Sequence, residues 1–272
     1  MADKIAFIGA GNMARSLVGG LLQHGVPPAS VVAADPDALQ RSNMAALGVA
    51  TTASNAAAID GAATVVLAVK PQAMRAVVLD LRPALDGKQL LISIAAGVPS
   101  KAIARWSGLR VGIVRCMPNT PALYGAGVTA LFANDWVTPQ QRTNAESTLA
   151  AVGHVIWVTE ETALDAVTAV SGSGPAYFFY LMEAMIAAGV ELGLDEATAR
   201  TLTLRTASGA ALMATQSGLA PAQLRRNVTS PGGTTESAIA VLDANHCRTA
   251  LIEALRQAAN RSVELAIELG AD

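Results

Sequence analysis

The stretch IAFIGAGNMA at residues 5–14 decides the fold. It begins with a four-residue apolar run, continues through the glycine turn Gly9-Ala10-Gly11, and opens an apolar helical pattern that lasts to His24. A turn of this kind between a strand and a helix is typical of dinucleotide-binding βαβ units, because glycine admits the pyrophosphate and the helix N-terminus stabilises its charge. We therefore predict dinucleotide binding here, with a purely structural strand-to-helix turn as the alternative.

Further apolar runs follow through the first half of the chain and alternate with helical patterns. The expected strands are residues 5–8, 31–34, 64–69, 89–94 and 110–116. This alternation predicts a parallel sheet covered by helices on both faces. After about residue 162 the expected elements are helices at residues 175–192, 195–216, 221–226, 235–242 and 246–269. We predict an α/β domain at residues 1–162 and an all-α domain at residues 163–272.

The charge and the apolar runs exclude several classes of partner. The chain has 272 residues, with 19 Lys and Arg against 21 Asp and Glu, so no basic surface for nucleic acid or an anionic membrane is expected. The most apolar run, residues 176–182, is too short to span a membrane. The two cysteines, Cys116 and Cys247, form no metal-binding or disulfide pattern. We expect a soluble, cytoplasmic protein that binds no metal.

The helix that follows Pro175 is apolar around its whole circumference at residues 176–182. A helix without a polar face must be covered on all sides, and a helical domain of this size cannot do that alone. We therefore predict a second copy of the chain as a partner, through an apolar helical interface.

Asp35 ends the second expected strand, 26 residues after Gly9. A carboxylate at this point accepts hydrogen bonds from the adenosine ribose of NAD and repels the 2′-phosphate of NADP. No arginine directly follows it, because five residues intervene before Arg41. The alternative is a solvated turn residue before Pro36.

Two other expected strands end in segments that lie at the ligand-binding edge of such a sheet. Ala68-Val69-Lys70-Pro71 follows one strand, and Met117-Pro118-Asn119-Thr120-Pro121 follows another. Ligands of open α/β sheets bind beyond the carboxyl ends of the strands, so both segments are candidates for cofactor contact. The alternatives are a solvated lysine and a loop made rigid by its prolines.

Two turns rich in Gly, Ser and Thr precede helical patterns in the second half, at residues 171–175 and 229–235. Backbone N–H groups and hydroxyls at a helix start suit a small carboxylate, and ordinary helix capping is the alternative. No lysine follows Lys101, and His246 is the single histidine of the expected all-α domain. A reaction that needs a strong base is therefore disfavoured, whereas a cyclic imine, whose nitrogen is readily protonated, accepts hydride after orientation alone.

Several segments together resemble the pyrroline-5-carboxylate reductase family. They are GAGNMA at 9–14, AVKP at 68–71, ISIAAGV at 92–98, RCMPNTP at 115–121, SGSGPAY at 171–177 and LRRNVTSPGGTTESAIAVLD at 224–243. The resemblance implies a Rossmann dinucleotide-binding domain followed by an all-α dimerisation and substrate-binding domain. It also implies hydride transfer from NADPH or NADH to 1-pyrroline-5-carboxylate, which yields L-proline, and dimers that often associate into decamers.

The resemblance also assigns candidate site residues. The substrate carboxylate would contact Ser230, Gly233, Thr234 and Thr235, and the Thr235 hydroxyl, close to the ring nitrogen, is the catalytic candidate. The substrate loop would come from the neighbouring subunit. The cofactor would contact Gly9, Gly11, Asn12 and Met13 at the pyrophosphate, Asp35 and Asn55 at the ribose, and Ala68, Lys70, Pro71 and Asn119 near the nicotinamide. Many relatives have Ser, Asn or Arg where this chain has Asp35, and we expect both dinucleotides to be used.

Two other functions remain as alternatives. One is a hydroxyacid dehydrogenase of the 6-phosphogluconate-dehydrogenase type, which would require a catalytic lysine in the second domain. The other is a nucleotide-sensing dimer without turnover, because a fold does not fix a function.

Overall fold

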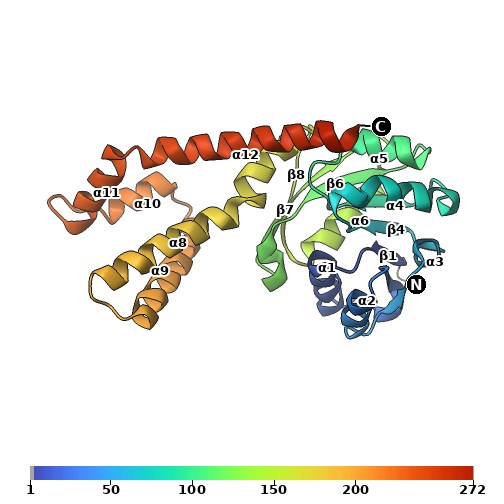
Figure 1. Ribbon diagram of the computed structural model, residues 1–272, viewed down its shortest axis with the longest axis horizontal. Helices are drawn as coiled ribbons and strands as arrows, with labels where there is room; N and C mark the ends of the chain where they lie inside the picture. The colour runs from blue at the N-terminus through green and yellow to red at the C-terminus, as the bar shows by residue number, and fades with distance from the viewer. Residues whose placement is uncertain (1–2, 272) are drawn as a thin grey trace. The chain divides into compact units, whose positions relative to one another are not determined.

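The computed structural model describes residues 3–271 and contains one eight-stranded sheet. The strands are β1 (Ile5–Ile8), β2 (Val31–Ala34), β3 (Ala50–Thr52), β4 (Thr64–Leu67), β5 (Leu90–Ser93), β6 (Ile113–Met117), β7 (Gly127–Ala133) and β8 (Gly153–Trp157). Their order is β3-β2-β1-β4-β5-β6-β7-β8 (Figure 1). All neighbours pair in parallel except β6 and β7, which are antiparallel. The first six strands have the Rossmann order, which confirms the predicted fold class.

Helices connect the strands and form the rest of the chain. They are α1 (Asn12–Gln23), α2 (Ala38–Ala45), α3 (Asn55–Ile59), α4 (Met74–Leu81), α5 (Ser100–Ser107), α6 (Pro139–Ala150), α7 (Ala163–Val167), α8 (Gly174–Glu191), α9 (Glu196–Gln216), α10 (Pro221–Asn227), α11 (Thr234–Ala244) and α12 (Cys247–Gly270). A π-helical turn, Thr168–Gly172, lies between α7 and α8. Strand signals do end before residue 163, as predicted.

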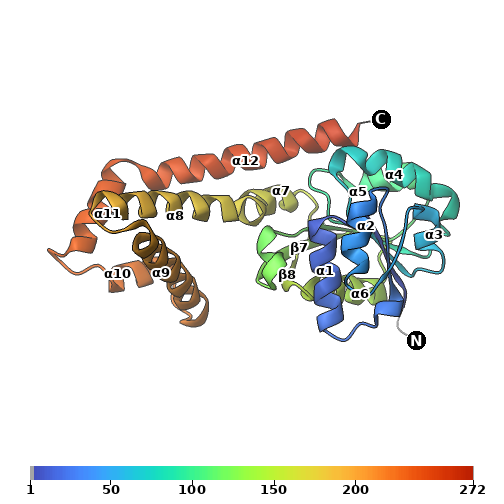
Figure 2. The ribbon, with the colours of Figure 1, turned by 60° about the horizontal axis from the view of Figure 1, so that its bottom comes forward.

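Successive side chains of the central strands enter two separate cores, because strand residues alternate between the faces of a sheet. The core that contains Phe7 is covered by α1, α2 and α6, and Figure 2 shows α1 and α2 on this face. The core that contains Ile8 is covered by α3, α4 and α5. The central strands are buried on both faces, which explains why their sequences are apolar without alternation.

Packing divides the chain into two units. The first runs to Ser173 and resumes at Ala258, and the second comprises Gly174–Gln257. The last part of α12 joins the first unit because Ser262 donates a 2.6 Å hydrogen bond to Asp165, and Arg105 donates one of 2.7 Å to the Gly270 carbonyl. The domain boundary expected at residue 162 was based on where the strands end, and it remains a prediction.

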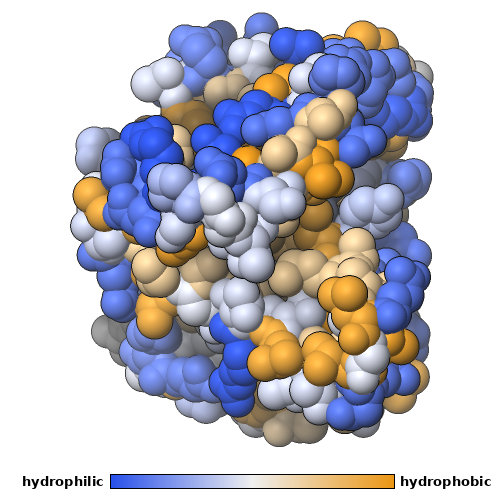
Figure 3. All heavy atoms as spheres, turned by 90° about the vertical axis from the view of Figure 1, so that its left-hand side faces the viewer, coloured by the Kyte–Doolittle hydropathy of each residue, from blue (hydrophilic) through white to orange (hydrophobic). Residues whose placement is uncertain are grey.

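The helical unit exposes many apolar side chains. Its helices α8 and α9 lie side by side, and Gly189 permits their contact, since a Cβ there would lie 2.9 Å from the Ala199 Cβ. Phe178, Phe179 and Tyr180 are 63%, 56% and 73% exposed. Figure 3 shows further apolar residues at the surface. Exposed apolar area of this extent is typical of a surface that another protein covers.

Candidate functional site

The glycine turn between β1 and α1 has the geometry that an anion requires. Gly9 has a φ of +99°, and a Cβ there would lie 2.5 Å from the Ala68 carbonyl oxygen, so only glycine fits. Gly11 is the N-cap of α1 and provides no side-chain cap. A Cβ on Gly11 would meet nothing within 4 Å, so the chain is open beside the start of α1. The free N–H groups of the first turn of α1 fit the pyrophosphate of a dinucleotide.

Asn12 and Met13, the other residues expected at the pyrophosphate, form the first turn of α1. Asn12 is exposed and its side-chain oxygen accepts a hydrogen bond from Arg15, whereas Met13 is half-buried against the core of Phe7. Their backbone N–H groups lie in the open first turn, so the structure keeps both available for the expected contact.

Asp35 lies beside the glycine turn, directly after β2. Its Oδ2 accepts a 2.8 Å hydrogen bond from the Ala10 N–H, and its Oδ1 accepts one of 2.9 Å from the Asp37 N–H. The half-buried carboxylate therefore links the end of β2 to the turn that would hold the pyrophosphate. The alternative interpretation, a solvated turn residue before Pro36, does not account for the bond to the Ala10 N–H, and the ribose contact itself remains a prediction.

Asn55 and the segment Ala68–Pro71 lie at the same edge of the sheet, where β3 and β4 end. The Asn55 amide donates a 3.0 Å hydrogen bond to Asp80 of α4, which fixes its orientation. The Ala68 N–H donates to the Ile8 carbonyl at 2.7 Å, so this segment adjoins the glycine turn. Lys70 is exposed and precedes a short helical turn that Pro71 opens. Asn55, Ala68, Lys70 and Pro71 therefore remain candidates for cofactor contact.

Asn119 is buried, and both ends of its amide are occupied. Its Nδ2 donates a 3.2 Å hydrogen bond to the Ser171 carbonyl, and its Oδ1 accepts one of 2.9 Å from the Val128 N–H. A Cβ on Gly172 would lie 2.3 Å from the Met117 Cε, so the two segments pack closely. Asn119 thus holds the π-helical turn in place, and its contact with nicotinamide remains a prediction.

The turn at residues 171–175 leads into α8 at Gly174, but it continues a π-helical turn and does not follow an open loop, and carboxylate binding there remains a prediction. It lies inside consecutive helical segments, where the Ser173 N–H donates to the Thr168 carbonyl at 2.8 Å and Ser171 Oγ donates to Val167 at 3.0 Å. The Ser173 N–H and the Ser171 hydroxyl are therefore already satisfied by the preceding helical residues.

The turn before α11 does open a helix and is left uncapped. Gly233 is its N-cap and has no side-chain cap, while the Gly233 N–H donates to the Ser230 carbonyl at 3.0 Å. Among the described residues 3–271, the hydroxyls of Ser230, Thr234 and Thr235 make no hydrogen bond shorter than 3.5 Å to the protein. The first-turn N–H groups and three hydroxyls thus form a set of donors that fits a carboxylate. Ordinary capping, the alternative, is not what these hydroxyls do.

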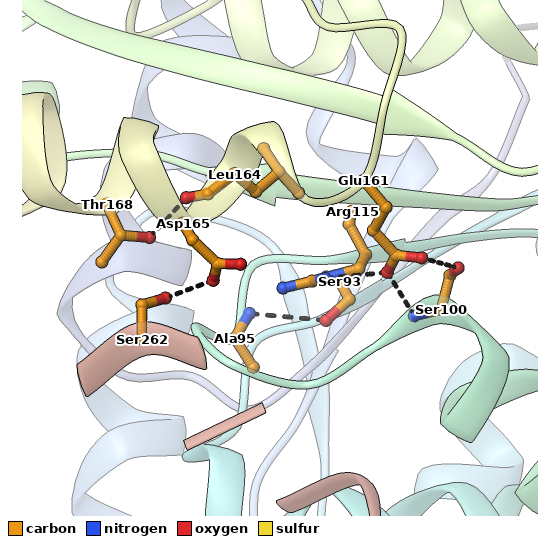
Figure 4. A network of polar contacts seen from close by, with 9 residues as sticks. All are labelled: Ser93, Ala95, Ser100, Arg115, Glu161, Leu164, Asp165, Thr168 and Ser262. Carbon is orange, nitrogen blue, oxygen red and sulfur yellow. Dashed lines mark hydrogen bonds and ion pairs between the residues drawn. The ribbon is translucent and has the colours of Figure 1, made fainter. Parts of the chain in front are cut away.

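A buried polar network supports the first unit near the ligand edge of the sheet (Figure 4). Glu161 accepts a 2.7 Å hydrogen bond from Arg115 of β6 and also accepts from the N–H (2.6 Å) and the hydroxyl (2.8 Å) of Ser100. Burial opposes the charge of Glu161, but the Ser100 N–H and the Arg115 guanidinium hold its pKa below the usual range. The network is structural, because its charges satisfy one another.

Other reactive groups give no second site. Burial raises the pKa of the Cys116 thiol far above its usual range, so it is not a nucleophile at neutral pH. In the described part of the chain, no three His, Cys, Asp or Glu side chains are placed to hold a metal ion. No helix there is both long and apolar enough to cross a membrane.

Two family models match separate parts of the chain. Residues 161–265 match the model for pyrroline-5-carboxylate reductase dimerisation. Residues 4–97 match the model for coenzyme F420-dependent NADP oxidoreductase.

Relatives match over the full length. The pyrroline-5-carboxylate reductase of Pseudomonas aeruginosa is 53% identical, with 98% of each chain covered, and that of Haemophilus influenzae is 44% identical, with 96% of this chain and 97% of the relative covered. The solved pyrroline-5-carboxylate reductase of Coxiella burnetii has a TM-score of 0.93 at 44% identity, covering 98% of this chain and 99% of the other. Pyrroline carboxylate reductase of Plasmodium falciparum, solved with NADP bound, has a TM-score of 0.88 at 28% identity. The match covers 97% of this chain and 98% of the other.

Proposed function

Because the chain belongs to the pyrroline-5-carboxylate reductase family, it reduces 1-pyrroline-5-carboxylate to L-proline with NADPH or NADH, and we propose which residues do so. The uncapped N-terminus of α11 would hold the substrate carboxylate, and the glycine turn after β1 would hold the pyrophosphate. The lack of a side-chain cap on α11 carries the first assignment. Both alternatives, the hydroxyacid dehydrogenase and the dimer without turnover, give way to the family assignment.

The donors at the start of α11 suit the substrate's charge. A carboxylate would accept hydrogen bonds from the N–H groups of Thr234 and Thr235 and from the hydroxyls of Ser230 and Thr235, while Gly233 leaves room for it. The α11 dipole adds favourable potential at this end. Glu236 does not compete for these donors, since its carboxylate accepts a 2.7 Å hydrogen bond from the Gly232 N–H.

The reaction itself requires orientation more than proton transfer. The bound dinucleotide supplies a hydride from its nicotinamide to the imine carbon. The helical unit contains no lysine and one histidine, His246, so no strong base or acid is at hand. The imine nitrogen is readily protonated by solvent, and the half-buried Thr235 hydroxyl would hydrogen-bond it and fix the ring.

The dinucleotide would extend along the ligand edge of the sheet. Its pyrophosphate would lie on the turn formed by Gly9, Gly11, Asn12 and Met13. Its ribose would lie near Asp35 and Asn55, and its nicotinamide near the segment Ala68–Pro71 and Asn119. The open space at Gly11 and the orientation of Asn55 by Asp80 support this placement.

The chain forms homo-oligomers through its helical half, which matches a dimerisation model. We propose dimers that associate into decamers and that donate the loop before α11 to the neighbouring subunit. The exposed Phe178 and Tyr180 of α8 would be covered in that interface. Light scattering after size-exclusion chromatography separates a mass of two chains from one of ten. A cytoplasmic location is proposed from the two unpaired cysteines, Cys116 and Cys247, which are typical of a reducing compartment.

Steady-state oxidation of NADPH or NADH by 1-pyrroline-5-carboxylate tests the assignment of the substrate site. Thr235→Ala is compared with Ser237→Ala, which removes a hydroxyl from the same helix outside the donor set. A fall in kcat/KM for Thr235→Ala alone supports the site. Equal kinetics of the two variants would refute it.

A further inference from the structure

An arginine that does not directly follow Asp35 in the sequence contacts the turn after β2. Arg41 lies on α2, six residues after Asp35, yet its Nη1 donates to the carbonyls of Asp35 and Pro36, both at 2.8 Å. The helix therefore folds the guanidinium back over the turn that joins it to β2. Arg41 is half-buried, and its position is fixed by two backbone oxygens.

The charge of this guanidinium is not neutralised. Within the described residues 3–271, Arg41 makes no ion pair with a carboxylate at 4 Å or less. The two carboxylates of the same turn are engaged elsewhere, since Asp35 accepts from the Ala10 and Asp37 N–H groups and Asp37 accepts from the Leu39 N–H at 2.8 Å. Nε and Nη2 of Arg41 are left to bind a ligand.

The location of the turn identifies the ligand's chemistry. In a Rossmann sheet the adenosine ribose lies beyond the end of β2, where a carboxylate reads a free 2′-hydroxyl and an arginine accommodates a 2′-phosphate. This chain places both groups at one turn. We propose, on the basis of the proposed function, that Arg41 binds the 2′-phosphate of NADPH and so admits NADPH although Asp35 favours NADH.

Arginine suits this role better than lysine would. Its planar guanidinium offers several donors in fixed directions, so Nη1 can hold the turn while the remaining donors bind phosphate. Asp35 opposes the phosphate by charge, and Arg41 offsets that repulsion. The pair explains how one site can accept both dinucleotides.

Binding of two cofactor fragments tests the proposal without turnover. ADP-ribose and 2′-phospho-ADP-ribose differ only in the 2′-phosphate, and neither contains nicotinamide. Isothermal titration calorimetry of the full-length protein gives the ratio of their Kd values. Loss of a charged hydrogen bond predicts that Arg41→Ala weakens the phosphorylated fragment about 10- to 100-fold. The Kd of ADP-ribose should stay within about twofold, because Nη1 contacts only the protein.

Two further variants make the result decisive. Arg110→Ala removes an exposed arginine that precedes β6. Arg110 lies at the amino end of its strand, away from the carboxyl ends where the dinucleotide would bind, so this variant should leave the Kd ratio unchanged. Arg41→Lys keeps the charge and should recover part of the ratio, and it also serves if the alanine variant does not fold. Equal weakening of both fragments would mean that Arg41 only anchors the turn and would overturn the proposal, as would an unchanged ratio.

The failure of this proposal and that of the proposed function are distinguishable. Absence of proline formation with both reduced dinucleotides in the unmodified protein would count against the function. The Kd ratio of the two fragments would still report on Arg41 alone.

Discussion

Replacing Asp35 by serine tests how the glycine turn and the ribose site depend on one carboxylate. The substitution removes the 2.8 Å hydrogen bond from the Ala10 N–H and the 2.9 Å hydrogen bond from the Asp37 N–H. Hydrogen bonds to charged groups contribute about 1.5–3 kcal/mol each when well formed. Because Asp35 is half-buried and serine can replace one of them, we expect a net loss of about 2 kcal/mol. For a unit of this size, that loss lowers Tm by about 4–8 °C.

The same substitution should change cofactor preference. A carboxylate and a 2′-phosphate that face each other through partly solvated space repel by about 1–2 kcal/mol. Removing the carboxylate should therefore raise the NADPH-to-NADH ratio of kcat/KM about 5- to 30-fold.

The assay is paired steady-state kinetics with both reduced dinucleotides, together with thermal unfolding. Asp37→Ser is the matched control, because it removes an equal charge from the same turn but contacts only the Leu39 N–H. An unchanged ratio for Asp35→Ser would refute the placement of Asp35 at the ribose. A ratio shifted equally by Asp37→Ser would show that net charge alone decides the preference.

Three other perturbations follow from the contacts described above. Thr235→Ala should raise the activation free energy by about 1–3 kcal/mol, which lowers kcat/KM roughly 5- to 150-fold. Tm should stay constant, because the Thr235 hydroxyl caps no helix. A lowered Tm with unchanged kinetics would show a cap instead. Asn119→Ala should lower the free energy of unfolding by about 2–3 kcal/mol, because it leaves the Val128 N–H and the Ser171 carbonyl without their partner. Urea unfolding measures this loss, and an unchanged midpoint of the urea transition would contradict it. The lowered pKa of Glu161 stabilises the fold above the unfolded pKa of about 4.3 and is lost as pH falls through the folded pKa. Glu161→Gln should therefore flatten the fall of Tm on acidification, and the exposed Glu160→Gln should not; equal acid profiles would contradict the role of Glu161.

The fold was predictable where local chemistry decides it. The glycine turn, the buried central strands and the helices α8 to α12 all follow from nearby residues, and β1 and β2 have the predicted bounds. β3, β7 and β8 were not among the expected strands. β8 lies at the edge of the sheet with alternating burial, and its Ile156 is 42% exposed, so it lacks the continuous apolar run of a central strand.

The site was less predictable where contacts span many residues. The π-helical turn Thr168–Gly172, which precedes the start of α8, is held by Asn119, 52 residues before Ser171, so residues 171–175 considered alone gave no sign of it. The bond between Asp35 and the Ala10 N–H spans 25 residues. Arg41 was set aside because five residues separate it from Asp35, yet one turn of α2 returns its side chain to the same place.

A crystal structure of the protein with L-proline and oxidised dinucleotide tests the central claim most directly. We predict the proline carboxylate within hydrogen-bond distance of the Thr234 and Thr235 N–H groups, with the Thr235 hydroxyl at the ring nitrogen. A proline bound elsewhere, with the start of α11 contacting only solvent, would contradict the account.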